Sequence, residues 1–176
     1  MFQVKTYEVH DYLYVPKLDG SESFTQISGT TTVNNGVMSG GSGYIYPFPN
    51  TTDWELSFKA LSSGVNCALV LIKVGTNARG KDILQIITDV NRYAQGYAYV
   101  GTSQTASTSR FATVSLNEWH DYIIKKQNGS ITLQVDNSTP VNISWSLISS
   151  LDELGIGVDT WTSSSMSIKE IFLKPL

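Results

Sequence analysis

The chain has 176 residues, of which 41% are hydrophobic and only 15% charged, and its formal net charge is −3. This length and composition fit one globular core, so we predict a single domain over residues 1–176. Nucleic-acid binding is excluded, because the longest basic run is the pair Lys125–Lys126 and phosphate backbones attract dense positive fields.

Residues 1–15 lack the continuous apolar stretch of a signal peptide, and no segment reaches the roughly 20 apolar residues that span a bilayer. We therefore predict no membrane insertion. Ser, Thr, Asn and Gly supply most of the polar surface, a composition common among extracellular and virion β-proteins. We expect a location outside the cell or on a virion surface.

Apolar residues recur with period two through much of the chain, and clusters of Gly, Asn, Asp and Ser interrupt them. This pattern predicts a sandwich or barrel of short strands. The clearest strands are expected over residues 44–48, 54–61, 68–74, 83–89, 92–100, 110–114, 119–126, 130–135, 154–158 and 166–173.

The early strands are expected to build the core. Tyr44 lies in the strand predicted over 44–48 and is more typical of packing than of ligand contact. Residues 54–61 alternate apolar and polar side chains, so one face packs inward and Trp54 is expected in the core or at its rim. Cys67, the only cysteine, precedes an apolar run and is expected to be a buried thiol, so no internal disulfide can form.

A turn containing Asp89, Asn91 and Arg92 separates two predicted strands. Strand periodicity places four side chains on one face of the second strand: Tyr93, Gln95, Tyr97 and Tyr99. Such a face is both aromatic and polar. It suits a ligand contact, but it is more typical of a tyrosine ladder along a half-buried sheet.

Further along the chain, residues 101–109 are rich in Ser and Thr and are expected to form a surface loop. Asn128–Gly129 predicts a tight hairpin between two strands, because this dipeptide tolerates the positive φ angles of such a turn. Trp119 begins this hairpin and is expected in the core or at its rim. Residues 145–151 could form one turn of helix with Trp145 packed against the fold.

Five stretches resemble the concanavalin A-like lectin and laminin-G-like superfamily: Trp54–Phe58, Glu118–Lys125, Gly129–Asp136, Leu154–Val158 and Ser167–Leu173. The resemblance implies an all-β, two-sheet antiparallel jelly-roll sandwich. That superfamily includes sugar-binding modules, glycoside hydrolases, adhesion domains and receptor-binding modules of phage tails. The resemblance therefore implies a fold and leaves the function open.

Catalytic motifs are missing from the sequence. The hydrolases of this superfamily carry Glu-x-Asp-x-x-Glu or Glu-x-Asp-x-Glu on one strand, and neither string occurs here. Asp152–Glu153 and Glu118 with Asp121 place their carboxylates at turns or on opposite faces. His10 and His120 each have an acidic neighbour that would face the other side of a strand. We predict that the protein is not an enzyme.

Metal sites have little support. One cysteine and two distant histidines do not suit structural zinc. A structural calcium ion could be held by loop oxygens, with five candidate side chains: Asp89, Asn91, Asp136, Asn137 and Asp159. No other cofactor is expected.

A carbohydrate site needs exposed aromatic rings interleaved with planar polar groups. Trp161 is the best candidate ring, because it follows Asp159 in a polar loop without apolar alternation; packing against the sandwich rim is the alternative. The predicted ligand-binding residues are Trp161, Tyr93, Arg92, Asn91, Asp89, Tyr97 and Asp159.

We therefore predict a non-catalytic, lectin-like module that binds a cell-surface saccharide as part of a larger multivalent assembly, such as a phage tail or baseplate. The alternative is a structural or protein–protein interaction domain on the same scaffold, in which the tyrosine-rich face is a subunit interface.

Overall fold

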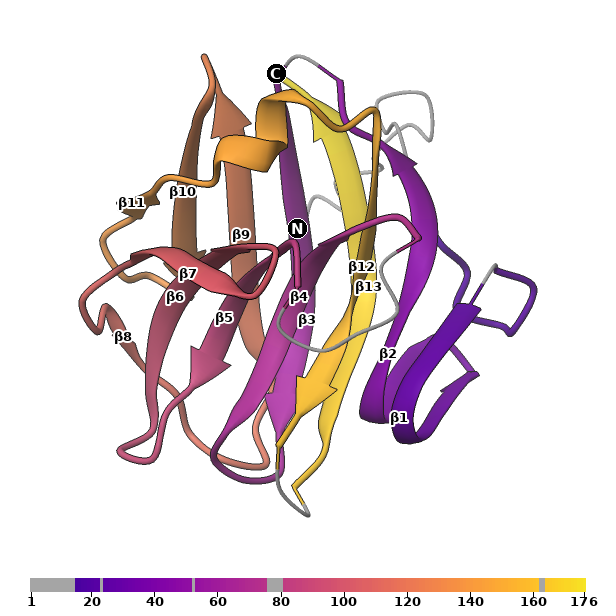
Figure 1. Cartoon of the computed structure of the whole chain (residues 1–176). Coiled ribbons are helices and arrows are strands. Elements are labelled where there is room, and N and C mark those ends of the chain that lie inside the picture. Colours follow the sequence, from indigo (N-terminus) through magenta and orange to yellow (C-terminus); the bar gives the residue numbers. More distant parts are fainter. Residues whose placement is uncertain (1–14, 23, 52, 76–80, 162–163) are drawn as a thin grey trace, which may run out of the picture.

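The computed structural model describes residues 15–22, 24–51, 53–75, 81–161 and 164–176. Within them the chain forms thirteen strands and one turn of 3-10 helix, Ser146–Ser149 (Figure 1). The strands are β1 (Phe24–Asn34), β2 (Val37–Pro49), β3 (Trp54–Ser62), β4 (Cys67–Lys73), β5 (Ile83–Thr88), β6 (Tyr93–Val100), β7 (Ser103–Ser107), β8 (Ala112–Thr113), β9 (His120–Gln127), β10 (Ser130–Val135), β11 (Val141–Ile143), β12 (Glu153–Thr160) and β13 (Met166–Pro175).

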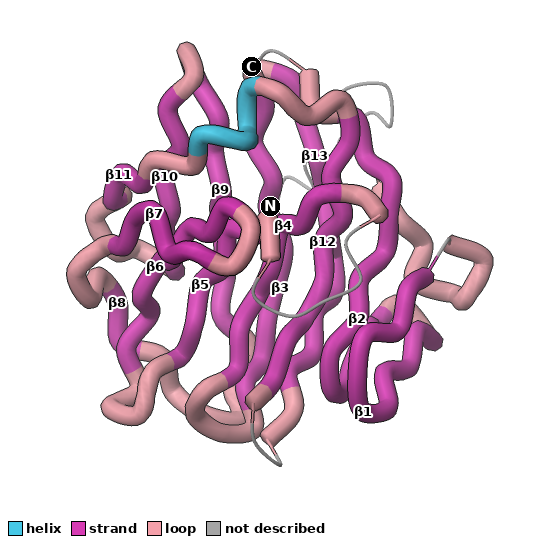
Figure 2. The backbone as a smooth tube through the Cα atoms, in the orientation of Figure 1, coloured by secondary structure: helices cyan, strands magenta, loops and turns pink. Residues whose placement is uncertain are grey.

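The strands pack as two antiparallel layers that share β2. The first sheet has the order β11-β10-β9-β3-β13, and the second has the order β12-β4-β5-β6-β7. The beginning of β2 pairs with β13, and the rest of β2 pairs with β12. The β1–β2 hairpin stands at one side of both layers (Figure 2). The predicted two-sheet antiparallel sandwich is confirmed.

Glycine allows β2 to pass from one sheet to the other. Gly40 has φ +131, a conformation that residues with a Cβ rarely adopt. A Cβ at this position would also lie only 2.1 Å from the carbonyl oxygen of Thr30 in the neighbouring strand β1. Both the backbone conformation and the close approach of β1 therefore require glycine at this corner.

Alternating side chains from the two sheets fill the space between them. The burial of β3 alternates along its whole length, as its sequence predicts, and Trp54 is fully buried. Phe58 and Tyr122 stack with ring centroids 5.7 Å apart at an interplanar angle of 6°. Cys67 is a buried free thiol, as expected, and burial raises its pKa to about 11. Burying each large apolar side chain stabilises the folded state by roughly 1.5–3 kcal/mol relative to leaving it exposed.

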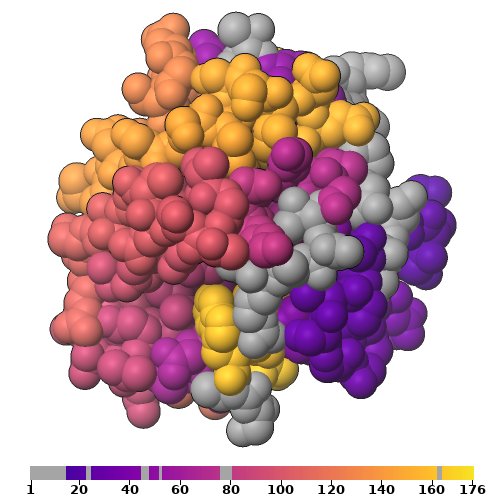
Figure 3. Space-filling view, in the orientation of Figure 1, coloured from indigo at the N-terminus to yellow at the C-terminus, as the bar shows by residue number. Residues whose placement is uncertain are grey.

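Asn50 closes the end of the sandwich at which the 3-10 helix lies. Its side-chain amide donates to the carbonyl oxygens of Ile148 and Leu151, both at 2.6 Å. Its oxygen accepts from the indole of Trp54 at 2.9 Å and from the ammonium of Lys126 at 3.0 Å. The segment that contains the 3-10 helix lies across this end in the space-filling view (Figure 3).

The structure corrects several expected elements. The loop expected over 101–109 contains strand β7, which pairs with β6. The strand expected over 110–114 shrinks to the two residues of β8. Strands β1, β11 and the beginning of β2 were not predicted. Their sequences are dominated by Ser, Thr, Gly and Asn, or are only three residues long, so they show little apolar alternation.

Other local predictions are confirmed. Asn128 and Gly129 form the tight turn between β9 and β10 with φ of 50° and 75°. The 3-10 turn lies within the predicted helical segment, and Trp145, which precedes it, is buried. No described helix is long and apolar enough to cross a membrane. His10 lies outside the described residues.

Candidate functional site

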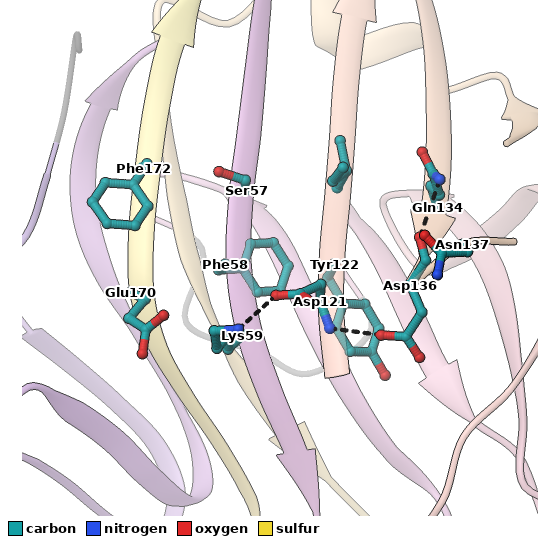
Figure 4. Close-up of a pocket in the computed structure, with 11 residues that line it drawn as sticks. Ser57, Phe58, Lys59, Asp121, Tyr122, Gln134, Asp136, Asn137, Glu170 and Phe172 are labelled. Carbon is teal, nitrogen blue, oxygen red and sulfur yellow. Dashed lines mark hydrogen bonds and ion pairs between the residues drawn. The ribbon is translucent and has the colours of Figure 1, made fainter. Parts of the chain in front are cut away.

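A groove of about 720 Å³ crosses the outer face of the first sheet (Figure 4). Its outward side chains are Ser57 and Lys59 from β3, Asp121 and Ile123 from β9, Gln134 from β10, Asp136 and Asn137 from the turn after β10, and Glu170 and Phe172 from β13. We refer to this surface as the groove.

Strand alternation explains why these side chains face outward. Phe58 and Tyr122 point into the core, so the residues on either side of them point away from it. Lys59 lies opposite Asp121 in the ladder between β3 and β9. In β13 the register shifts near Glu170, which has φ +52 and adds one residue to the outer side of the strand.

An ion pair occupies the middle of the groove. The ammonium of Lys59 lies 3.0 Å from a carboxylate oxygen of Asp121. The hydrogen bond to Asp121 raises the pKa of Lys59, and the charges of Asp121, Glu170 and Asp136 add to the effect. Lys59 therefore stays positively charged in the groove.

Asp136 is held at the edge of the groove by hydrogen bonds. One carboxylate oxygen lies 2.7 Å from Nδ1 of His120, and the other accepts the backbone N–H of Asp121 at 2.9 Å. Nε2 of His120 lies 3.1 Å from the carbonyl oxygen of Ser115, so both ring nitrogens have an oxygen partner. This network fixes Asp136 and the turn that carries Asn137.

Trp119 lies beside the groove rather than in the core. Its side chain is 38% exposed, and the ammonium of Lys169 lies 4.3 Å from the centroid of its ring. Trp119 is two residues before Asp121, so strand alternation places both on the outer side of the sheet. The groove therefore has two aromatic rings nearby, those of Trp119 and Phe172.

The structure brings five of the seven predicted ligand-binding residues to one end of the second sheet. The last residues of β12 and β5 and the second residue of β6 are in register through β4. Trp161, Asp89 and Tyr93 therefore lie in one row, with Asn91 and Arg92 in the adjoining turn. Trp161 and Tyr93 are three strand spacings apart, which is about 14 Å.

Asp89 organises this end of the sheet. One oxygen of its carboxylate accepts the backbone N–H groups of Asn91 and Tyr93 at 2.8 and 3.0 Å, and the other lies 2.5 Å from Nε of Arg110. Burial disfavours the ionised form, but these N–H donors and the charge of Arg110 outweigh it and lower the pKa of Asp89. Asp89 therefore fixes the turn, and both oxygens of its carboxylate are already used by hydrogen bonds.

Tyr93 and Trp161 remain accessible, at 38% and 39% exposed. The guanidinium of Arg110 lies 5.3 Å from the centroid of the Tyr93 ring. Asn91 and Arg92 are exposed in the same turn. We call Trp161, Asp89, Asn91, Arg92, Tyr93 and Arg110 together the rim.

The other two predicted residues lie apart from the rim. Asp159 is buried and bonded to the hydroxyl of Ser42. Tyr97 is half-buried on the outer face of the second sheet, opposite Gln85 in the ladder. Gln85 is only 4% exposed, and its side-chain oxygen has no hydrogen-bond partner. The structure therefore separates Asp159 and Tyr97 from the exposed turn.

The calcium donors suggested by the sequence are also dispersed. Asp136 and Asn137 border the groove, whereas Asp89 and Asn91 belong to the rim. Among the described residues, no three His, Cys, Asp or Glu side chains come close enough to hold a metal ion. Calcium binding stays a prediction from the sequence.

Sequence reasoning missed the groove itself. Lys59, Gln134 and Phe172 occupy the polar or outward positions of strands that were predicted correctly. Their alternation indicated that they face solvent. What the sequence does not contain is the strand order β10-β9-β3-β13, which brings these positions together.

Comparison with solved structures gives many similar folds. Carbohydrate-binding module CBM66 from Bacillus subtilis is 10% identical, with a TM-score of 0.61 over 88% of this chain and 97% of that chain. The metal-free exoplasmic/lumenal domain of VIP36 is 12% identical, with a TM-score of 0.64 over 96% and 93% of the two chains; a Ca²⁺/Man-bound form of that domain also matches.

A putative glycosyl hydrolase from Parabacteroides distasonis is 13% identical, with a TM-score of 0.60 over 94% of this chain and 98% of that chain. No protein-family model and no curated protein matches the sequence. At these identities the likeness shows the fold, a lectin-like sandwich.

Proposed function

We propose that this chain is a non-catalytic carbohydrate-binding module that holds a saccharide in the groove of the first sheet. The observation that carries the proposal is the combination of groups around one hollow. Planar hydrogen-bonding side chains of Asp121, Gln134 and Asn137 line it, and the rings of Phe172 and Trp119 lie within or beside it.

Each of these groups suits a part of a sugar. The C–H face of a pyranose packs on an aromatic ring, and its hydroxyls both donate and accept hydrogen bonds. Asp121 accepts, Lys59 donates, and the amides of Gln134 and Asn137 can do both. The network around Asp136 fixes one wall before a ligand arrives, which lowers the entropy lost on binding.

The arrangement of the carboxylates supports binding without catalysis. Glycoside hydrolysis needs one carboxyl group that is protonated and free to donate to the leaving oxygen. Asp121 is paired with Lys59, and Asp136 is bonded to His120 and to a backbone N–H. Both carboxylates are therefore already engaged by partners at the groove, which leaves neither of them free to approach a leaving oxygen.

The likeness to CBM66 and to VIP36, which has been solved with Ca²⁺/Man bound, supports a saccharide as the ligand class. A shallow groove on a sheet face implies weak single-site affinity, so useful binding would need several copies. A display on a cell or virion surface, such as a phage tail that recognises host saccharides, would provide them.

A glycan array followed by calorimetry tests the proposal. We expect selective binding by the unaltered chain, with affinity reduced about tenfold or more in Trp119→Ala and in Asp121→Asn, since each removes a stacking ring or a charge-assisted hydrogen bond. Trp161→Ala, on the other sheet, is the matched aromatic control and should leave binding of that glycan unchanged.

Three results would count against it. Loss of binding only in Trp161→Ala or Tyr93→Ala would move the site to the rim. Release of reducing sugar from a bound oligosaccharide would show catalysis. Silence of well-folded protein across the whole array would favour the structural or protein-binding alternative.

A further inference from the structure

We infer that the rim is a second saccharide-binding surface and that it selects sugars carrying a carboxylate. The inference rests on the proposed function for the ligand class, but it uses different residues on the opposite sheet. It would give the chain two binding surfaces of different charge preference.

The rim is organised before any ligand binds. The carboxylate of Asp89 accepts two backbone N–H groups of its own turn and the Nε–H of Arg110. These three contacts fix the turn and hold the guanidinium of Arg110 beside the ring of Tyr93. A surface fixed in this way loses little conformational entropy when a ligand arrives.

Arg110 keeps donors available for an anion. A guanidinium has five N–H donors in a planar fork, and only Nε–H is used by Asp89. The side chain is 47% exposed, so its terminal nitrogens can reach a carboxylate, which the fork can bind through two parallel hydrogen bonds. Arg92 adds a second exposed guanidinium in the same turn.

Charge separates the rim from the groove. Arg92 and Arg110 bring two positive charges to the turn, whereas its one carboxylate, Asp89, is already bonded. In the groove, Asp121, Asp136 and Glu170 outnumber Lys59 and the neighbouring Lys169. An acidic sugar is therefore attracted to the rim and disfavoured in the groove.

The positions of the rings set the length and orientation of the ligand. Arg110 lies against the Tyr93 ring, which stays partly exposed, and Trp161, also partly exposed, lies three strand spacings away in the same row, about 14 Å along the sheet. Only an oligosaccharide can contact both rings. Arg92 and Arg110 both belong to the Tyr93 end, so the acidic sugar unit belongs there and a neutral unit at the Trp161 end.

Calorimetry with one acidic and one neutral probe tests this inference on the full chain. The probes are an oligogalacturonate and its carboxyl-reduced counterpart, which differ only in the carboxylates. We expect the oligogalacturonate to bind at least tenfold more tightly, since a charge-assisted hydrogen bond contributes about 1.5–3 kcal/mol. Raising the salt concentration from about 0.05 to about 0.5 M should weaken it.

Two substitutions locate the site. Arg92→Gln removes one exposed charge, and Arg110→Lys keeps the charge but loses the planar fork that binds carboxylates through two bonds. Each should reduce oligogalacturonate affinity about tenfold. Asp121→Asn, in the groove, should not reduce it, and thermal melting checks that every variant is folded.

The possible outcomes separate this inference from the proposed function. Equal affinity for the two probes, or loss of oligogalacturonate binding in Asp121→Asn alone, would overturn the inference. Neutral glycans bound in the groove without any effect at the rim would leave the proposed function standing and reject the inference. Acidic binding lost in the arginine variants, with no binding in the groove, would support the rim and reject the groove. Binding of a protein but of no glycan at the rim would reject it as a sugar surface.

Discussion

At the scale of single residues, Asn50 combines more structural contacts than its polar character suggests. One amide connects the loop after β2 to the segment around the 3-10 helix, to the buried indole of Trp54 and to the end of β9. Lys126 is largely buried here, and burial lowers its pKa although the charge of Asp53 opposes the shift. The end of the sandwich at which the 3-10 helix lies is therefore held together through the side chain of Asn50.

Replacing Asn50 by Ala should destabilise the protein by about 3 kcal/mol, because four hydrogen bonds are lost and buried partners are left unpaired. Urea denaturation measures the free energy of unfolding. Asn142→Ala, at an exposed asparagine of β11, is the control and should change stability by less than about 0.5 kcal/mol. Equal effects of the two substitutions would show that the four hydrogen bonds of Asn50 do not stabilise the fold.

Asp89 gives the protein a pH-dependent contribution to stability. Because the pKa of Asp89 is lowered in the folded state, its contribution is fully present above the unfolded pKa of about 4 and is lost as the pH falls through the folded pKa. Asp89→Asn should therefore be less stable than the unaltered chain at pH 7, by about 1 kcal/mol, and the difference should shrink below pH 4.

Thermal unfolding of both proteins between about pH 2 and pH 7 measures this difference. Asp152→Asn, at an exposed carboxylate, is a suitable control with a small effect throughout. A gap between Asp89→Asn and the unaltered chain that stays constant with pH would contradict the assignment.

At the scale of strands, β2 and β12 pack too closely for a side chain between them. A Cβ on Gly157 would lie 2.1 Å from the carbonyl oxygen of Gly43 and 2.5 Å from Cβ of Tyr44. Those atoms belong to the backbone and to the base of a side chain, so they cannot move aside without shifting β2.

Gly157→Ala should thus destabilise the protein by about 3 kcal/mol. Gly129→Ala is the matched control, because φ is +75 but nothing lies within 4 Å of the added Cβ, and it should cost only about 1 kcal/mol. Chemical denaturation compares the two, and similar losses would show that β12 can move away from β2.

The strands also show what the sequence can predict. Segments with strict apolar alternation, such as β3 and the β9–β10 hairpin, were located correctly because burial follows the alternation. Strand β1 and the beginning of β2 escaped prediction, since they pair mainly through their backbones and carry Ser, Thr and Gly. A strand that is held mainly by backbone hydrogen bonds need not show alternating apolar and polar side chains, so the sequence pattern does not reveal it.

Of the two candidate surfaces, the rim was partly predicted from the sequence and the groove was not. Tyr93 and its turn were predicted because they adjoin one another in the chain, and their contribution to a ligand site remains a prediction. The groove was missed because Lys59, Asp121 and Phe172 lie on strands far apart in the sequence. Only the order of strands in the sheet places them together.

At the scale of the whole molecule, the two sheets should unfold together. β2 pairs with β13 in one sheet and with β12 in the other, so neither sheet can separate without disrupting a shared strand. We expect one transition in urea. Far-ultraviolet circular dichroism and the fluorescence of buried Trp54 and Trp145 should give the same midpoint.

A background with Trp119→Phe and Trp161→Phe removes the exposed indoles, so that fluorescence reports only the core. Two separated midpoints in this background would mean that the sheets unfold independently and that β2 does not couple them.

The shared strand also shapes how the protein forms during synthesis. β2 is made early, but its partners β12 and β13 are the last strands in the order of the chain. Until they leave the ribosome, β2 has only β1 beside it, and the apolar inner faces of β3 and β4 have no complete layer to cover them. We therefore expect the nascent chain to expose apolar surface until β12 and β13 have been made.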